Sequence, residues 1–250
     1  MRSVSAWCWL PWALAALALS ALRFPVAADP TQLGDGVLIL HNPVQQDFSI
    51  EPPEGWCQNY RDRFAITSCE QQVNRIDSFP YDGCGKTWFV LAAWDEPKEF
   101  VAVEFGFAPY PAGEWEILEW GPCFPGEGIE QRTPAWPGPN QGVRLGATSL
   151  PWTGNLVPVY WFCGVGYYIE DPHLLPLGPN PASGFAGFTN TLDPPQSWDA
   201  ACLGAIGWRT DGVLCCPPNT QGIEEEDSGP KPATPPSTWS MIKAIYRSDP

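Results

Sequence analysis

The segment Phe100–Phe107 reads FVAVEFGF and decides the fold class of the chain. Large apolar residues stand at every second position, separated by Ala102, Glu104 and Gly106. Successive side chains of a β-strand point to opposite faces, so this period of two predicts a strand with one buried face. Similar short runs rich in Val, Ile, Phe, Tyr and Trp, bounded by turn residues, predict strands at residues 36–41, 64–68, 87–94, 115–120, 143–148, 157–168, 185–191, 201–209 and 213–216.

Helical periodicity is nearly absent from residues 29–217, where only the short segment Glu70–Ile76 favours a helix. The sequence therefore predicts a mainly β fold with an antiparallel, sandwich-like arrangement. A weak internal repeat favours two related β units, 29–135 and 136–217, packed as a double sandwich. Chance similarity in a chain this rich in proline and aromatic residues is the alternative.

The first 28 residues have the pattern of a secretory signal peptide. Arg2 precedes an apolar run from Trp7 to Leu22, and Val26-Ala27-Ala28 places small residues before a cleavage point. We expect residues 1–28 to be removed and the mature chain to be secreted or held at the cell surface. No later segment approaches the roughly 20 apolar residues that a membrane-spanning helix requires, so we expect no membrane span in the mature chain.

Eight of the nine cysteines remain after the signal peptide: Cys57, Cys69, Cys84, Cys123, Cys163, Cys202, Cys215 and Cys216. In an oxidising compartment this even set predicts up to four disulfides, with the pairing undetermined. If Asp211-Gly212 formed a two-residue hairpin turn, Cys202 would lie too far from Cys215 and Cys216 and would need another partner. Because consecutive strand residues face opposite ways, Cys215 and Cys216 should have two different partners.

Acidic residues dominate the charge of the chain. The mature part keeps 11 of the 13 basic residues against all 28 acidic ones, a net charge of −17. Such a polyanion repels nucleic acid and anionic lipid, so neither is expected as a partner. No cofactor or metal is predicted. Calcium is the alternative that the acidic surplus leaves open, although the chain contains no EF-hand loop.

Carboxylates beside tryptophans raise the alternative of a carbohydrate-active hydrolase. Glu114 and Glu116 would share one face of a predicted strand, and Glu104 lies on another, so these residues are the candidate catalytic carboxylates. The simpler interpretation is a solvated strand face. Nucleophilic catalysis is not predicted, because His41 and His173 are the only histidines and Ser183 lacks the preceding glycine of a nucleophile elbow.

Two tryptophans in proline- and glycine-rich turns are the candidate binding residues. Trp136 and Trp152 could lie exposed on loops and stack on a glycan or contact a surface protein. The alternative is that the tryptophans fill the core, as large aromatic residues do in a β protein poor in methionine.

The C-terminal part differs in composition from the rest. Residues 218–237 form an acidic, proline-rich stretch that predicts an extended linker. Residues 238–250 follow, with Trp239, Ile242, Ile245 and Tyr246 at helical spacing, which predicts a short amphipathic helix. The segment 238–247 is therefore a candidate docking or sorting element, with packing against its own β domain as the alternative.

Several short motifs together resemble a set of secreted bacterial proteins of unknown function. They are Gly36-Val37-Leu38-Ile39, Glu54-Gly55-Trp56-Cys57, Trp88–Trp94, Glu104-Phe105-Gly106-Phe107, Gly121–Pro125 and Gly184–Phe188. The resemblance implies export and β architecture and assigns no catalytic residue. The sequence as a whole favours a secreted, disulfide-stabilised, non-enzymatic binding or structural module, with the secreted hydrolase as the alternative.

Overall fold

A computed structural model describes residues 32–43, 54–77, 85–113, 115–166 and 172–217. The chain is mainly β, as predicted. The predicted signal peptide, Cys84, Glu114, the linker and the C-terminal helix lie outside the described residues. The elements are β1 (Val37–His41), α1 (Trp56–Arg63), the 3-10 turn η1 (Cys69–Gln71), β2 (Arg75–Ile76), β3 (Lys86–Phe107), β4 (Trp115–Pro122), β5 (Gly128–Arg132), β6 (Gly142–Ala147), β7 (Trp152–Gly166), β8 (His173–Gly178), β9 (Gly187–Asn190), β10 (Ser197–Asp199), β11 (Cys202–Leu203) and β12 (Ala205–Trp208).

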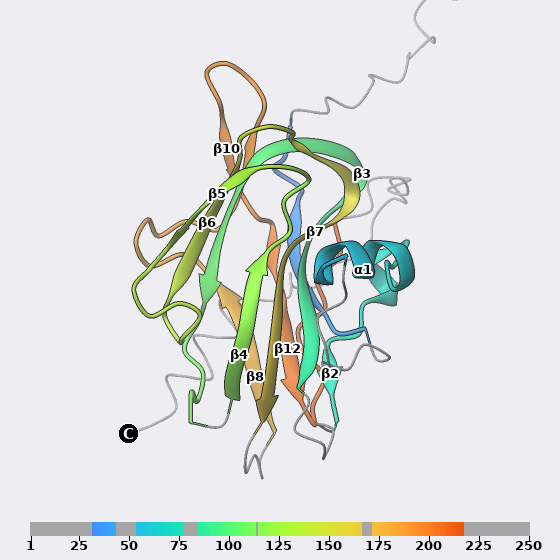
Figure 1. The fold of residues 1–250 in the computed structure, drawn as a ribbon, viewed down its shortest axis with the longest axis vertical. Coiled ribbons are helices and arrows are strands. Elements are labelled where there is room, and N and C mark those ends of the chain that lie inside the picture. The colour runs from blue at the N-terminus through green and yellow to red at the C-terminus, as the bar shows by residue number, and fades with distance from the viewer. Residues whose placement is uncertain (1–31, 44–53, 78–84, 114, 167–171, 218–250) are drawn as a thin grey trace, which may run out of the picture.

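The long strand β3 organises the sheet. It has 22 residues and joins the two segments predicted as separate strands, 87–94 and 100–107. Its register against β7 shifts between Ala93 and Lys98, where the exposed residues Asp95, Glu96 and Pro97 form the bend. Figure 1 shows β3 arching over the top of the molecule at this point. The irregularity bends the strand without ending it, as β-bulges do.

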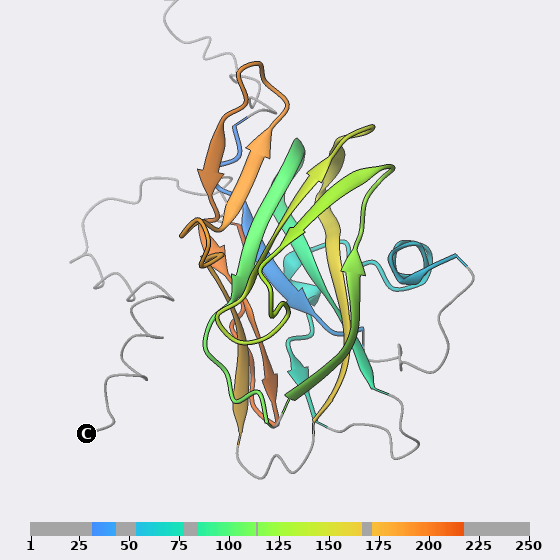
Figure 2. The same cartoon turned by 60° about the vertical axis from the view of Figure 1, so that its left-hand side comes forward.

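The sheet is mixed and curls into a half-barrel. One edge of β3 pairs first with β7 and then with β6, and its other edge pairs with β1, β9 and β8. The pairs β1–β11 and β12–β2 are parallel, and the other strand pairs are antiparallel. Figure 2 shows the strands curving around a common interior. The units 29–135 and 136–217 thus contribute strands to one sheet, and their relation by a repeat stays a prediction.

Both faces of the first half of β3 are buried, in two separate clusters. Trp88, Val90, Ala92 and Trp94 face the interior of the half-barrel, where 27 described residues form the inner core. The alternate residues Phe89, Leu91 and Ala93 face outward and join the outer core, a cluster of nine buried residues that includes Trp56 and Tyr60 of α1. The helix therefore covers the outer face of the sheet (Figure 2).

The structure corrects three local predictions. The strand predicted at residues 213–216 is wrong, because Val213 forms an isolated bridge with Ala205 and residues 214–217 belong to no strand. The helix predicted at Glu70–Ile76 is wrong, because this segment contains η1 and then β2, which pairs in parallel with β12. The strand predicted at residues 64–68 is also wrong, because Phe64 ends α1 and the following residues form bends. The real helix lies just before, where Trp56, Tyr60 and Phe64 repeat every four residues. That spacing was the available signal.

Among the described residues, three disulfides are present: Cys57–Cys123, Cys69–Cys216 and Cys202–Cys215. They use six of the eight predicted cysteines, and Cys215 and Cys216 have different partners, as predicted. A fourth disulfide stays a prediction, since Cys163 is buried in β7 while Cys84 lies outside the described residues.

The expectation that Cys202 pairs elsewhere than with Cys215 or Cys216 is wrong. It assumed a two-residue turn at Asp211-Gly212, which would place Val213 opposite Thr210. Instead Val213 pairs with Ala205, so the chain returns in a different register. This register brings the Cα atoms of Cys202 and Cys215 within 5.8 Å, a normal disulfide separation.

Candidate ligand-binding pocket

A pocket of about 400 Å³ opens on the outer face of the molecule, between α1 and the end of β4. We call it the α1 pocket. Its lining includes Gln58 and Arg61 of α1, the Cys57–Cys123 disulfide, Trp161 of β7 and Glu54. Phe124 also contributes to the lining, while its ring packs toward Trp152 and the inner core. Ligand sites are commonly concave and hold a few precisely placed polar groups. The accessible lining of this pocket is mainly polar, with Trp161 as its aromatic member on the sheet.

Local sequence explains why α1 stands at this position. Gly55 precedes the helix with φ of 79°, a left-handed conformation that favours glycine, and the chain turns there into α1. Trp56 and Tyr60 are buried against the outer core, whereas Gln58 and Arg61 lie on the exposed side. Spacings of three and four residues place side chains on one helix face, so the buried pair anchors α1 and leaves the polar pair at the pocket.

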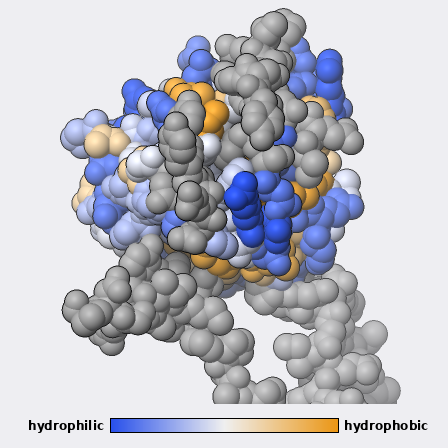
Figure 3. Space-filling view, turned by 90° about the horizontal axis from the view of Figure 1, so that it is seen from below, coloured by the Kyte–Doolittle hydropathy of each residue, from blue (hydrophilic) through white to orange (hydrophobic). Residues whose placement is uncertain are grey.

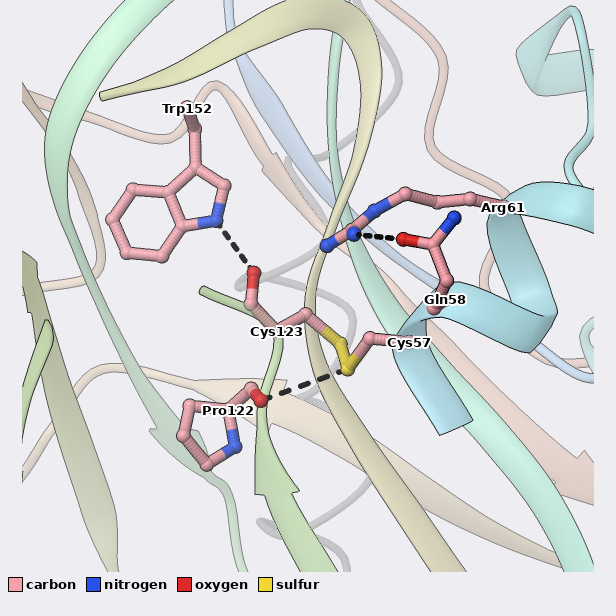
Figure 4. Close-up of a disulfide and its surroundings, with 6 residues drawn as sticks. All are labelled: Cys57, Gln58, Arg61, Pro122, Cys123 and Trp152. Atoms are coloured by element: carbon pink, nitrogen blue, oxygen red, sulfur yellow. Dashed lines mark hydrogen bonds between the residues drawn. A yellow bond between two sulfur atoms is a disulfide. The ribbon is translucent and has the colours of Figure 1, made fainter. Parts of the chain in front are cut away.

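The disulfide fixes α1 to the strand beside it. Cys123 directly follows β4, and its amide donates a 2.9 Å hydrogen bond to the carbonyl oxygen of Val159 in β7. Its own carbonyl oxygen accepts a 2.9 Å hydrogen bond from the indole nitrogen of Trp152. The Sγ atom of Cys57 lies 3.6 Å from the carbonyl oxygen of Pro122 (Figure 4). The pocket wall is therefore held by covalent and hydrogen bonds to the sheet.

Trp161 forms the aromatic wall because its strand partner is a glycine. Gly121 of β4 lies opposite Trp161 of β7, and a Cβ atom at Gly121 would lie 2.9 Å from the indole nitrogen. The missing side chain lets the indole lie over the β4 backbone. Trp56 packs against it, with ring centroids 5.8 Å apart. Trp161 remains partly exposed, so its ring is held in place yet accessible.

Gln58, Arg61 and Asp62 form a hydrogen-bonded chain along the helix. The Gln58 amide nitrogen donates a 2.8 Å hydrogen bond to Oδ1 of Asp62. The Gln58 amide oxygen accepts a 3.1 Å hydrogen bond from the Arg61 guanidinium. Figure 4 shows Gln58 and Arg61 extending together from α1 near the disulfide. Burial by the surrounding protein lowers the pKa of Arg61, although Asp62 opposes that shift. The guanidinium is thus oriented and partly desolvated.

The predicted exposure of Trp136 and Trp152 is wrong. Trp136 is 6% exposed, stacks on Phe107 in the inner core and donates a 3.0 Å hydrogen bond to the Tyr160 hydroxyl. Trp152 is 1% exposed and stacks on Phe100. Proline and glycine neighbours suggested loops, but curling of the sheet turns both indoles inward. Neither ring is accessible for stacking on a ligand, and these two residues follow the alternative in which tryptophan fills the core.

The candidate carboxylates are not brought together at the α1 pocket. Glu104 is buried in β3, where Oε1 accepts hydrogen bonds from Asn180 Nδ2 (2.9 Å) and from the Ser183 hydroxyl, and Arg144 lies 3.9 Å from Oε2. These contacts tie the loop after β8 to the sheet. Glu116 is exposed on β4 opposite Val165, and Glu114 lies outside the described residues.

The two histidines lie in different surroundings. His41 is buried beside Tyr60, and its Nδ1 atom accepts a 2.9 Å hydrogen bond from the Val73 amide. Burial lowers the pKa of His41 to about 4. His173 lies in a second hollow of about 670 Å³, lined partly by Pro109, Tyr110 and Asp211.

That second hollow has fewer available polar groups. The Tyr110 hydroxyl donates to the Pro137 carbonyl oxygen, and Asp211 pairs with Arg75 at 3.3 Å. The hollow lies at the lower end of the half-barrel, and Figure 3 shows a mosaic of hydrophilic and hydrophobic surface at that end.

Within the described ranges, Cys69, Glu70 and Cys216 are close enough together to hold a metal ion. Both sulfur atoms are already joined in a disulfide, so this group does not fit a metal. Among the same residues, no helix is long and apolar enough to cross a membrane.

The pocket residues Gln58, Arg61 and Trp161 were not predicted from the sequence. Two basic residues, Arg61 and Arg63, close together in an acidic chain were a local signal for this region. Trp161 was visible as an aromatic strand residue, but its pairing with Gly121 depends on two strands about 40 residues apart, a tertiary arrangement that local periodicity does not reveal.

No protein-family model matches the chain, and neither a curated protein nor a solved structure matches it.

Proposed function

We propose that the chain is a secreted, disulfide-stabilised, non-enzymatic module that binds a glycan in the α1 pocket. The observation that carries the proposal is the Trp161 indole, partly exposed and held by its contacts with Gly121 and Trp56 on the wall of an open pocket. An aromatic ring fixed in this way loses little conformational freedom when a ligand stacks on it. The apolar face of a sugar ring is a suitable stacking partner.

Polar groups beside Trp161 suit the hydroxyl groups of a sugar. Gln58 offers both a donor and an acceptor, Arg61 offers donors, and Glu54 offers acceptors. Such a combination of one aromatic face with mixed hydrogen-bonding groups is typical of sites that orient a small polar ligand. Two of these side chains stand on one rigid helix, which supports a preformed site.

Binding without turnover is favoured over hydrolysis by the composition of the lining. Glycoside hydrolysis ordinarily requires two carboxyl groups about 5 to 9.5 Å apart across the scissile bond. Glu54 is the carboxylate of the pocket lining, and it lies 3.8 Å from Arg63. The buried Glu104 serves the loop after β8 instead. A hydrolase using Glu104, Glu114 or Glu116 is the second candidate in this proposal.

Export to the cell surface or the medium belongs to the same proposal. The signal-peptide pattern of residues 1–28 and the three disulfides support it, since disulfides persist in oxidising compartments. The resemblance to secreted bacterial proteins of unknown function supports it as well. Docking through residues 238–247 stays a prediction, because that segment lies outside the described residues.

A glycan array probed with the mature chain (residues 29–250) tests the proposal. We expect selective binding that falls about tenfold or more in Trp161→Ala, because a buried aromatic anchor commonly dominates affinity. Trp198→Ala is the matched control, since Trp198 is also partly exposed but stands on β10, outside the pocket. Binding to no glycan, or equal losses in both variants, would contradict the proposal. Sugar release that disappears in Glu104→Gln or Glu116→Gln would favour the hydrolase.

A further inference from the structure

Arg61 differs from the other described arginines in the groups that contact its guanidinium. Five arginines have a carboxylate within 4 Å or lie over an aromatic ring: Arg63 with Glu54, Arg75 with Asp77 and Asp211, Arg132 with Glu130, Arg144 with Glu104, and Arg209 over Trp208. Among the described residues, Arg61 has no carboxylate within that distance. Its guanidinium bonds instead to the neutral amide oxygen of Gln58. The chain has a net charge of −15, and Asp62 acts on Arg61 from beyond 4 Å while its own oxygen accepts from Gln58.

From this arrangement we infer that the α1 pocket recognises the carboxylate of an acidic sugar, a uronic acid, and that Arg61 is the residue that binds this group. The inference rests on the proposed glycan-binding function and specifies its ligand class.

The hydrogen-bond chain prepares Arg61 for such a ligand. Asp62 accepts from the Gln58 amide nitrogen, which turns the Gln58 oxygen toward the guanidinium. Gln58 takes one of the five N–H donors of Arg61, and the planar fork can bind a carboxylate through two parallel hydrogen bonds.

The neighbouring side chains favour a sugar as the carrier of that carboxylate. Trp161 lines the same pocket as Arg61, so one ligand can stack a ring on the indole and present a carboxylate to the guanidinium. A uronic acid carries its carboxylate directly on a pyranose ring and meets both requirements. Arg63 in the last turn of α1 pairs with Glu54 at 3.8 Å, which offsets the charge of the carboxylate in the pocket lining.

Calorimetric titration with paired ligands tests the inference. The probes are an oligogalacturonate and its methyl ester of the same length, which differ only in the charge and acceptor geometry of the carboxyl groups. We expect the mature chain to bind the acid about tenfold or more tightly than the ester, as a charge-assisted hydrogen bond would give. Free galacturonic acid should compete, whereas sodium acetate at equal concentration should not, because acetate lacks the ring.

Variants of Arg61 assign the preference to one residue. Arg61→Gln should abolish the discrimination between acid and ester, and Arg61→Lys should reduce it, since lysine keeps the charge but lacks the planar fork. Arg209→Gln is the matched control because it removes the same charge outside the pocket, and we expect it to keep the discrimination. Arg61 is exposed at the pocket rim, so its variants should fold, which thermal unfolding checks.

The outcomes separate this inference from the proposed function. If Arg61→Gln keeps the preference for the acid, or the unmodified chain binds both ligands equally while Trp161→Ala loses both, the inference is overturned and glycan binding stands. Competition by acetate as effective as that of galacturonic acid would show recognition of a simple carboxylate and would also overturn it. Absence of binding to every glycan would count against the proposed function itself.

Discussion

The inner and outer faces of the curled sheet are held by different means. The inner core contains 27 described residues, and thirteen of them are aromatic, from Trp88 to Trp208. The outer core under α1 contains nine, and two disulfides, Cys57–Cys123 and Cys202–Cys215, belong to it or pack against it. A small cluster buries little apolar area and gains from covalent links, whereas a large aromatic core does not need them.

The difference between the two faces affects the proposed binding site, because the α1 pocket lies on the outer face. Regions with few buried apolar contacts open locally at lower free energy than the main core. The Cys57–Cys123 disulfide limits such opening at the pocket wall. We therefore expect the inner core to determine global stability and the outer layer to determine the shape of the pocket.

Removing an indole from the inner core should have the largest effect. Trp152→Ala loses the stacking on Phe100 and the hydrogen bond to Cys123. We expect the free energy of unfolding to fall by about 4 kcal/mol. Urea unfolding followed by circular dichroism measures it. Trp152→Phe keeps much of the stacking and should cost clearly less. A loss below about 1 kcal/mol in the alanine variant would show that the aromatic core does not dominate stability.

Breaking the link between α1 and β4 should have the next largest effect. The double variant Cys57→Ala/Cys123→Ala opens a loop that spans 66 residues. We expect the free energy of unfolding to fall by about 3 kcal/mol. Hydrogen exchange should accelerate in α1 but change little in β3 and β7, because the inner core remains intact. Uniform acceleration across β3 and α1 would mean that the two layers unfold as one unit.

Acid should weaken the outer layer through His41. The pKa of His41 falls from its ordinary value of 6.5 to about 4, so below pH 6.5 the unfolded chain binds a proton that the folded chain excludes. Stability from this residue is therefore complete above pH 6.5 and declines as the pH falls, by about 2 kcal/mol between pH 7.5 and 5. Protonation at Nδ1 would also remove the acceptor of the Val73 amide.

Denaturant unfolding at several pH values, compared with His41→Gln, measures this contribution. Glutamine does not titrate, so the slope of stability against pH should be shallower in the variant. Equal slopes in the two proteins would assign the acid sensitivity to other groups.

The smallest effect on stability should come from Gly121→Ala, with the consequence confined to the pocket. The added methyl group would lie 2.9 Å from the Trp161 indole nitrogen, so the indole must shift. Because a side chain rather than backbone gives way, we expect stability to change by less than about 1 kcal/mol while glycan binding weakens. Unchanged binding would show that the position of the indole over Gly121 does not matter for the ligand.

Local patterns predicted the strands that bury strongly apolar sequence. The alternation in Phe100–Phe107 predicted the second half of β3, and the runs around Val37 and Val157 predicted β1 and much of β7. The sequence did not predict β5, whose residues are mostly exposed and lack apolar alternation. That strand exists because it pairs with β6, and pairing partners are not visible in a local pattern.

The candidate site was less predictable than the fold. Proline and glycine around Trp136 and Trp152 suggested exposed loops, yet the exposed indole at the pocket is Trp161, inside a strand. Whether a tryptophan is buried depends on which elements cover its face of the sheet. For Trp161 the answer depends on Gly121 and α1, which meet it only in the folded chain.

The sequence by itself determined the mainly β class and the acidic character, because these follow from composition and from the two-residue period of a strand. Cys215 and Cys216 have different partners as predicted, although the two residues lie outside any strand. Only the tertiary structure decided the disulfide pairing, the inward position of Trp136 and Trp152, and the meeting of Arg61 with Trp161 and the Cys57–Cys123 bond. The physical reason is the range of the interactions. Backbone alternation acts between neighbours in the chain, whereas register, sheet curvature and the covering of a face depend on contacts between residues far apart in sequence.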